Sequence, residues 1–204
     1  RMSASSHSGG HRYAPENTKD VLGWLEKDKK RVINNSRALE LEISKKKQYE
    51  ELKRFNINFP KTYYAKDIKE IIENSKKFNK PFITKHNRGG RGLGVKYFKN
   101  TSELENYVNK NFENSIDGTT LLQEYIDSNP KVITRVEFVK GEFLYAVQVD
   151  ASDGFELCPA DECNVEEKFC PANPDGNKFM ILKNYENPEI KKYEALLKSN
   201  GIEI

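Results

Sequence analysis

The chain has 204 residues, 36% of them hydrophobic and 32% charged, and its 34 Lys plus Arg against 31 Asp plus Glu give a formal net charge of +3. This length suits one domain with a core or two small lobes, and the grouping of apolar residues into periodic segments excludes a disordered chain. The small positive excess argues against a general nucleic-acid binder, and no apolar run is long enough for a bilayer span or a secretory signal.

The three cysteines, an odd and sparse number, fit the reducing conditions of the cytoplasm, where we expect the protein to reside. Arg1 is not a natural start, and Ile204 closely follows a helix stop. We therefore expect a fragment of a longer chain.

The first half of the chain is predicted to alternate helices with strands. The expected elements are a loop over 1–17, a helix over 18–29 with Val21, Leu22, Trp24 and Leu25 inward, a short buried strand over 31–34, a helix from Ser36 to Phe55, a strand after Pro60, a helix over 66–78, strands over 80–84 and 94–98, and a helix over 102–112 that begins with a Ser102–Glu105 capping box.

The second half is predicted to contain a buried strand over 119–126 and a hairpin over 131–150 that turns at Lys140-Gly141. A loop-rich part over 151–185 follows. Asn187 caps the last helix, with Pro188 at its first position and Gly201 at its end. Helices mixed with hairpins favour an α+β fold with helices packed on antiparallel sheets.

The stretch KPFITKHNRGGRGLGVKYF, residues 80–98, is the main candidate for a ligand site. It joins two strands, whereas dinucleotide-binding and Walker-type loops run into a helix, so neither motif applies. One interpretation is an exposed hairpin with solvated basic residues. The other is a lid whose glycine amides approach phosphate oxygens. The residues that favour an anion site are Lys85, Arg88, Gly89, Gly90, Arg91, Gly92 and Gly94.

Three further segments have both a structural and a functional interpretation. The run Lys45–Lys47 is usually a solvated helix face, but one lysine can turn inward to a phosphate. The strand residues Gln123 to Ile126 fit an ordinary core strand with an exposed Gln-Glu pair, or an apolar slot with backbone groups for adenine. Arg135 can pair with Glu137 across a neighbouring strand or can face a ligand anion.

Metal sites are not indicated by the remaining chemistry-bearing residues. Cys158, Cys163 and Cys170 lack a Cys-x-x-Cys pair and are interpreted as ordinary thiols. The histidines His7, His11 and His86 show no ligand spacing, and His86 is interpreted as a solvated loop residue. Asp161 and Glu162 are assigned to a loop.

These segments, in this order, resemble the ATP-grasp carboxylate–amine ligases, particularly the RimK-like glutamate ligase branch. The resemblance covers residues 30–150 well, through SK…QY…L…NINFPKT, KPFITKHNRGGRGLGV, TSELENYV, LLQEYI and TRVEFVKGEFLYAVQV. It departs from the family at Ile133, where an acidic residue is common, and at Asn56, which replaces a glycine and tolerates the same left-handed geometry.

The resemblance assigns roles to individual residues. Arg135 would hold the transferring phosphoryl group or the tetrahedral intermediate. The nucleotide would be bound by the two lysines Lys45 and Lys85, by the loop residues Arg88, Gly89, Gly90, Arg91, Gly92 and Gly94, and by the hinge residues Gln123, Glu124, Tyr125 and Ile126. The metal ligands are expected beyond Ile204.

The implied fold is the ATP-grasp fold, α+β, with two small lobes whose antiparallel sheets grip ATP. The expected divisions are a linker over 1–30 from a missing N-terminal domain, a first lobe over 31–122, and a truncated second lobe over 123–204. The implied function is an ATP-dependent ligase that joins a carboxylate to an amine through an acyl phosphate, with glutamate or another amino acid as substrate.

ATP and Mg2+, or Mn2+ in its place, are the implied cofactors, and the implied partners are the carboxylate and the amine, as small molecules or a peptide end. Neither nucleic acid nor a membrane is expected, and an oligomer is compatible with the resemblance. Two alternatives remain open: a non-catalytic ATP-binding module with an incomplete metal site, and a basic nucleic-acid-binding protein. The fragment alone can be inactive even if its parent is an enzyme.

Overall fold

The computed structural model describes residues 13–89, 94–151 and 179–203. Within these ranges, no helix has the length and apolar character needed to cross a membrane. The elements are, in chain order, α1 (Ala14–Lys27), α2 (Ser36–Glu42), α3 (Lys45–Arg54), β1 (Thr62–Ala65), α4 (Ile68–Ser75), β2 (Phe82–His86), β3 (Lys96–Phe98), α5 (Thr101–Asn111), β4 (Thr120–Glu124), β5 (Val132–Val139), β6 (Glu142–Asp150), β7 (Phe179–Leu182) and α6 (Glu189–Ser199).

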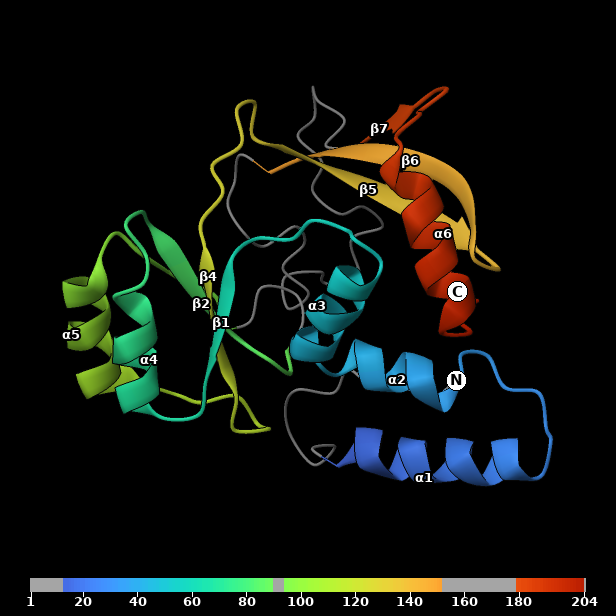
Figure 1. Cartoon of the computed structure of the whole chain (residues 1–204), viewed down its shortest axis with the longest axis horizontal. Helices are drawn as coiled ribbons and strands as arrows, with labels where there is room; N and C mark the ends of the chain where they lie inside the picture. The colour runs from blue at the N-terminus through green and yellow to red at the C-terminus, as the bar shows by residue number, and fades with distance from the viewer. Residues whose placement is uncertain (1–12, 90–93, 152–178, 204) are drawn as a thin grey trace, which may run out of the picture.

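The first antiparallel sheet has the strand order β1-β4-β2-β3 and lies between α4 and α5 on one side and α3 on the other (Figure 1). Phe82 and Leu122 from the sheet join the core formed with α4 and α5, and both are at most 1% exposed. Because side chains alternate along a strand, Lys85 points to the face opposite that of Phe82. This face is turned toward α3.

The second antiparallel sheet has the order β5-β6-β7, and α6 packs on one of its faces (Figure 1). The ring centres of Phe138 in β5 and Tyr193 in α6 are 6.2 Å apart, and the Phe143 N–H donates to the Glu194 carboxylate at 3.0 Å. The hairpin turns at Lys140-Gly141 as predicted. Both residues have positive φ, 53° and 69°, as a two-residue hairpin turn of the primed type requires. The α+β fold expected from the sequence, with helices packed on antiparallel sheets, is confirmed.

The N-terminal helix differs from its prediction. α1 begins at Ala14, because Pro15 and Glu16 suit a first helical turn. It packs through its first turns, where Pro15 and Thr18 are buried. Val21 is 41% and Trp24 66% exposed, so the prediction that they face inward is wrong.

The strand predicted over 31–34 does not form, and Ile33 is 50% exposed. The segment instead leads into α2, where the Asn35 side chain accepts a hydrogen bond from the Ala38 N–H at 2.8 Å. The single helix predicted from Ser36 to Phe55 is split in two, because Ser44 adopts an extended backbone and caps α3. The short apolar patterns in residues 31–55 did not distinguish a strand from a link, or one long helix from two short ones.

Two further predictions concern helix starts. The start of α5 is not a Ser102–Glu105 box: Asn100 accepts from the Glu103 N–H at 3.0 Å, and Glu103 accepts from the Lys99 N–H at 2.8 Å. This arrangement is similar to a capping box and begins two residues earlier, but Glu103 binds the N–H of Lys99, the residue before the Asn100 cap.

The Asn187 cap is confirmed, since its side chain accepts from the Glu189 N–H at 2.9 Å, although α6 begins at Glu189, after Pro188.

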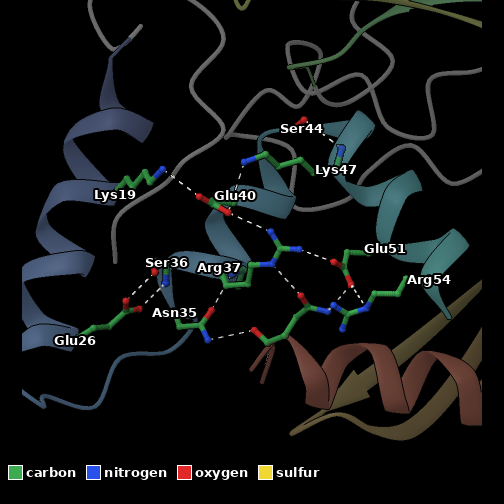
Figure 2. A network of polar contacts seen from close by, with 12 residues as sticks. Lys19, Glu26, Asn35, Ser36, Arg37, Glu40, Ser44, Lys47, Glu51 and Arg54 are labelled. Carbon is green, nitrogen blue, oxygen red and sulfur yellow. Dashed lines mark hydrogen bonds and ion pairs between the residues drawn. The ribbon is translucent and has the colours of Figure 1, made fainter. Parts of the chain in front are cut away.

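The end of the described chain is fastened to α2 and α3 by a polar network around Glu51, whose side chain is 9% exposed (Figure 2). Arg37 of α2 donates to one carboxylate oxygen of Glu51 at 2.5 Å, and Asn200 donates to the other at 3.2 Å. Arg54 adds an ion pair to the same carboxylate at 3.4 Å. The second sheet is thus linked, through α6, to α2 and to α3, the helix that carries Lys45.

We expect Glu51→Gln to lower the free energy of unfolding by about 1–3 kcal/mol, because it removes the negative charge that Arg37 and Arg54 share. Urea denaturation measures the change. Glu50→Gln is the matched control, an exposed carboxylate on the same helix, and it should stay within about 0.5 kcal/mol of the wild type. Equal losses in both variants would show that the network does not stabilise the fold.

Candidate phosphate site

Two lysines from separate elements face each other on the α3 side of the first sheet. Lys45 is the first residue of α3, after the Ser44 cap. Lys85 lies near the end of β2, and its Nζ is 6.0 Å from the centre of the Tyr49 ring of α3. The fold therefore brings together the two lysines that the sequence singled out, 40 residues apart in the chain.

Asn87, two residues after Lys85, fastens the start of α3 to the end of β2. Its side-chain oxygen accepts from the Lys46 N–H at 2.8 Å, and its backbone oxygen accepts from the Lys45 N–H at 3.2 Å. Its side-chain NH2 donates to Ser44 Oγ at 3.2 Å and to the Asp117 carboxylate. Two of the amide donors that a helix start leaves unpaired are thus taken by Asn87.

The ammonium group of Lys45 is held beside the loop that follows Asn87. Its Nζ donates to the Gly89 carbonyl and lies 3.5 Å from the Asn87 carbonyl. Burial, and then the charge of Lys85, lower the pKa of Lys45 to about 8, while Asp117 acts in the opposite direction. Lys45 and Lys85 are two neighbouring cations, and Lys45 is partly buried. An anion bound between them would reduce their repulsion, so the position favours anion binding.

Only the ends of the glycine-rich loop belong to the described residues. Gly90, Arg91 and Gly92 lie outside them, whereas Gly94 is described with a φ of +75°. A Cβ at Gly94 would lie 3.0 Å from the His86 ring, so a side chain there would be both strained and crowded. His86 itself is half-buried, and its Nε2 lies 3.1 Å from the Glu113 carbonyl. His86 is the last residue of β2, so its assignment to the loop is wrong, while its side chain is partly exposed.

Arg88 is 8% exposed and its guanidinium is engaged by a carboxylate. Its Nη1 donates to Glu16 of α1 at 2.7 Å, and its backbone N–H donates to Ser115 Oγ at 3.1 Å. In this conformation Arg88 fixes the first part of the loop. A direct contact with phosphate would require the pair with Glu16 to open.

The four predicted hinge residues end β4 and leave the first sheet. Gln123 is 4% exposed, so it is not part of an exposed Gln-Glu pair, and it donates to Tyr49 Oη at 2.9 Å and to Thr62 Oγ1 at 2.7 Å. Glu124 accepts from the Lys61 N–H at 2.7 Å. Tyr125 donates its N–H to the Pro81 carbonyl, while Ile126 is 62% exposed and no hydrogen bond to its N–H exists within the described ranges.

Arg135 lies on the face of the second sheet opposite to α6. Phe138, which contacts Tyr193 of α6, is three positions away and therefore on the other face of β5. The Arg135 side chain is exposed. Ile133 and Glu137 share its face, as predicted.

A metal centre is not formed by the part of the chain that the structure describes, which contains no group of three or more His, Cys, Asp or Glu suited to one. Cys158, Cys163, Cys170, Asp161 and Glu162 lie outside the described residues, as do His7 and His11.

Asn87, Asp117, Tyr49 and Glu16 were not singled out from the sequence. Ser44, a residue type favoured at helix starts, is the local signal that the helix carrying Lys45 begins at that point. The contacts of Asn87 with Ser44 and Asp117 join residues far apart in the chain, and no motif announces them.

Solved structures define the class of the chain as the ATP-grasp fold. A RimK-domain ATP-grasp protein from Sphaerobacter thermophilus matches with a TM-score of 0.53 and 13% identity, over 67% of this chain and 52% of that one. The D-alanine–D-alanine ligase from Bacillus anthracis complexed with ATP matches at 0.55 and 19%, over 89% and 54%. The ATP-grasp ligase PsnB complexed with its minimal precursor matches at 0.57 and 14%, over 94% and 54%.

The family model of the RimK-like ATP-grasp domain matches residues 43–167, which include Lys45, Lys85 and Arg135. This is more than half of the chain, which therefore belongs to the RimK-like ATP-grasp family, and the resemblance seen in the sequence is confirmed. No curated protein matches the chain. The chain spans about half the length of the three structures named above.

The pKa of Lys45 gives a direct test of the site before any ligand is added. Lys85→Met should raise that pKa, because it removes the neighbouring positive charge, and Asp117→Asn should lower it further. A pH titration of the lysine 13Cε signals by NMR measures both shifts. An unchanged midpoint in both variants would show that the two lysines do not share one electrostatic site.

Proposed function

We propose that this chain is the nucleotide-binding part of an ATP-dependent ligase that joins a carboxylate to an amine. The observation that carries the proposal is geometric. Within a RimK-like ATP-grasp domain, Lys45 begins α3 with its Nζ bound to the Gly89 carbonyl, and Lys85 of β2 has its Nζ 6.0 Å from the Tyr49 ring of the same helix. The negative charge of a polyphosphate would interact favourably with both lysines.

The surroundings of the two lysines support a nucleotide in one orientation. The phosphates would lie against Lys45 and Lys85, at the loop of residues 86–94. The adenine would lie at the opposite end of β4, where Ile126 offers an exposed side chain and a backbone N–H. An apolar surface with one or two backbone groups is the usual setting for an adenine ring.

The proposed reaction has two steps. A carboxylate oxygen of the substrate attacks the γ-phosphorus of ATP, and the bond to the β-phosphate oxygen breaks, which gives an acyl phosphate and ADP. The amine nitrogen then attacks the acyl carbon and inorganic phosphate leaves, with loss of one proton from the nitrogen, so that an amide remains. Neither step needs a nucleophile from the protein, only cations on the phosphates and exclusion of water.

Lys45 and Lys85 would stabilise the charge that develops on the phosphates. Arg135, from the second sheet, would hold the transferring phosphoryl group through its planar guanidinium. A divalent cation, Mg2+ or Mn2+, would accompany the nucleotide. The described residues offer no cluster of His, Cys, Asp or Glu side chains to hold that ion.

The proposed substrates are an amino acid such as glutamate, or another carboxylate, and an amine from a small molecule or a peptide end. Two of the matched structures, a D-alanine–D-alanine ligase and an ATP-grasp ligase complexed with its minimal precursor, support this class of substrate. We also propose the division into a first lobe over 31–122 and a second over 123–204, and a cytoplasmic location.

Lys85→Ala tests the proposal through nucleotide affinity. We expect the dissociation constant for ATP, measured by calorimetry, to rise about 10- to 100-fold, because a charge-assisted contact with the phosphates is lost. Lys47→Ala is the matched control. Lys47 lies on the same helix as Lys45 but is 3.5 Å from the Glu40 carboxylate, so its removal should change the affinity less than about twofold.

Unchanged affinity in Lys85→Ala would contradict the assignment of the site. Tight ATP binding without trapping of an acyl phosphate by hydroxylamine, with glutamate and other amino acids as substrates, would indicate a non-catalytic nucleotide-binding module instead.

A further inference from the structure

Helix α1 precedes the segment that matches the family, and three of its charged side chains form polar contacts with other described parts of the chain. Glu26 accepts from the Ser36 N–H and Oγ, both at 2.7 Å, and Lys19 donates to Glu40 at 3.1 Å (Figure 2). Both contacts fasten α1 to α2. The third residue, Glu16, reaches a different target, the start of the glycine-rich loop.

The contact between Glu16 and Arg88 uses both carboxylate oxygens. Arg88 Nη1 lies 2.7 Å from Glu16 Oε1, and Nη2 lies 3.4 Å from Oε2. The Arg88 side chain is 8% exposed, whereas that of Glu16 is 52% exposed. Loss of Glu16 would therefore remove this ion pair from a buried positive charge and would favour a movement of the arginine toward water.

Such a movement would be transmitted to the proposed phosphate site. Arg88 directly follows Asn87, and the Arg88 N–H is bound to Ser115 Oγ at 3.1 Å. Asn87 in turn binds the backbone N–H groups of Lys45 and Lys46. Glu16 is thus connected to Lys45 by Arg88 and Asn87, two adjacent residues whose backbone is fixed on both sides.

We propose that Glu16 is a positioning residue for the phosphate site, contributed by a helix outside the family domain. It acts through Arg88, which anchors the loop and does not itself contact the nucleotide. This inference rests on the proposed function for its effect on ATP, but its effect on the loop can be measured without any ligand.

Hydrogen exchange of the ligand-free protein tests the effect on the loop. In Glu16→Gln, the amides of Asn87 and Arg88 should exchange roughly threefold faster or more, because the loop loses its anchor. Glu26→Gln is the matched control: it removes another carboxylate contact of α1 that does not reach the loop, and it should leave these two amides unchanged. Unchanged exchange in Glu16→Gln, or an equal increase in Glu26→Gln, would overturn the inference.

Exchanging the charges of Glu16 and Arg88 tests whether Arg88 anchors the loop or binds phosphate directly. ATP affinity should fall roughly threefold or more in Glu16→Arg and in Arg88→Glu, and should return to within about twofold of the wild type in the double variant. If Arg88 binds phosphate directly, the double variant stays weak, because a glutamate at position 88 repels the nucleotide, and the inference fails. A wild-type protein that does not bind ATP would refute the proposed function, while the exchange measurement would still decide the role of Glu16.

Discussion

The clamp made by Asn87 is the interaction on which the candidate site depends. One asparagine binds the first two amides of α3, the Ser44 cap and Asp117, and its own N–H donates to the Thr119 carbonyl at 3.0 Å. The start of α3 and the end of β2 are thereby fixed to each other. Without that restraint, Lys45 would become more solvated and would move away from Lys85. Because burial, and then the charge of Lys85, lower the pKa of Lys45, that pKa would rise toward its usual value.

The rest of the fold supports this clamp from two directions. α4 and α5 bury the opposite face of the first sheet, which keeps β2 and β4 in register. The network around Glu51 holds the other end of α3 against α2 and α6 (Figure 2). The helix that carries Lys45 is therefore held at both ends, and the second sheet is attached to the same helix through α6.

The sequence predicted the elements whose signals are local. The strand–loop–strand around Lys85, the turn at Lys140-Gly141 and the Asn187 cap all follow from residues within a few positions of one another. The short Val32-Ile33 stretch was misread because two apolar residues do not decide between a strand and an exposed link, and the contacts that decide are tertiary.

The sequence predicted the charged residues of the site, but it did not predict the contacts that hold them in place. Lys45 and Lys85 could be named because the motifs occur in the family's order. Arg88 was interpreted from its charge alone, since its partner Glu16 lies 72 positions away in the sequence. Asn87 lies within the stretch KPFITKHNRGGRGLGV but carries no charge. Only the folded chain shows that it joins α3 to β2.

The central claim, that Lys45 is part of a phosphate site held under electrostatic repulsion, is tested most directly by proton uptake on nucleotide binding. At about pH 9 a lysine with a pKa of about 8 is roughly nine-tenths neutral, and phosphate binding favours its charged form. Calorimetric titration with ATP in two buffers of different ionisation enthalpy should therefore show uptake of nearly one proton, and Lys45→Met should show none. Binding without proton uptake in the wild type would contradict the account.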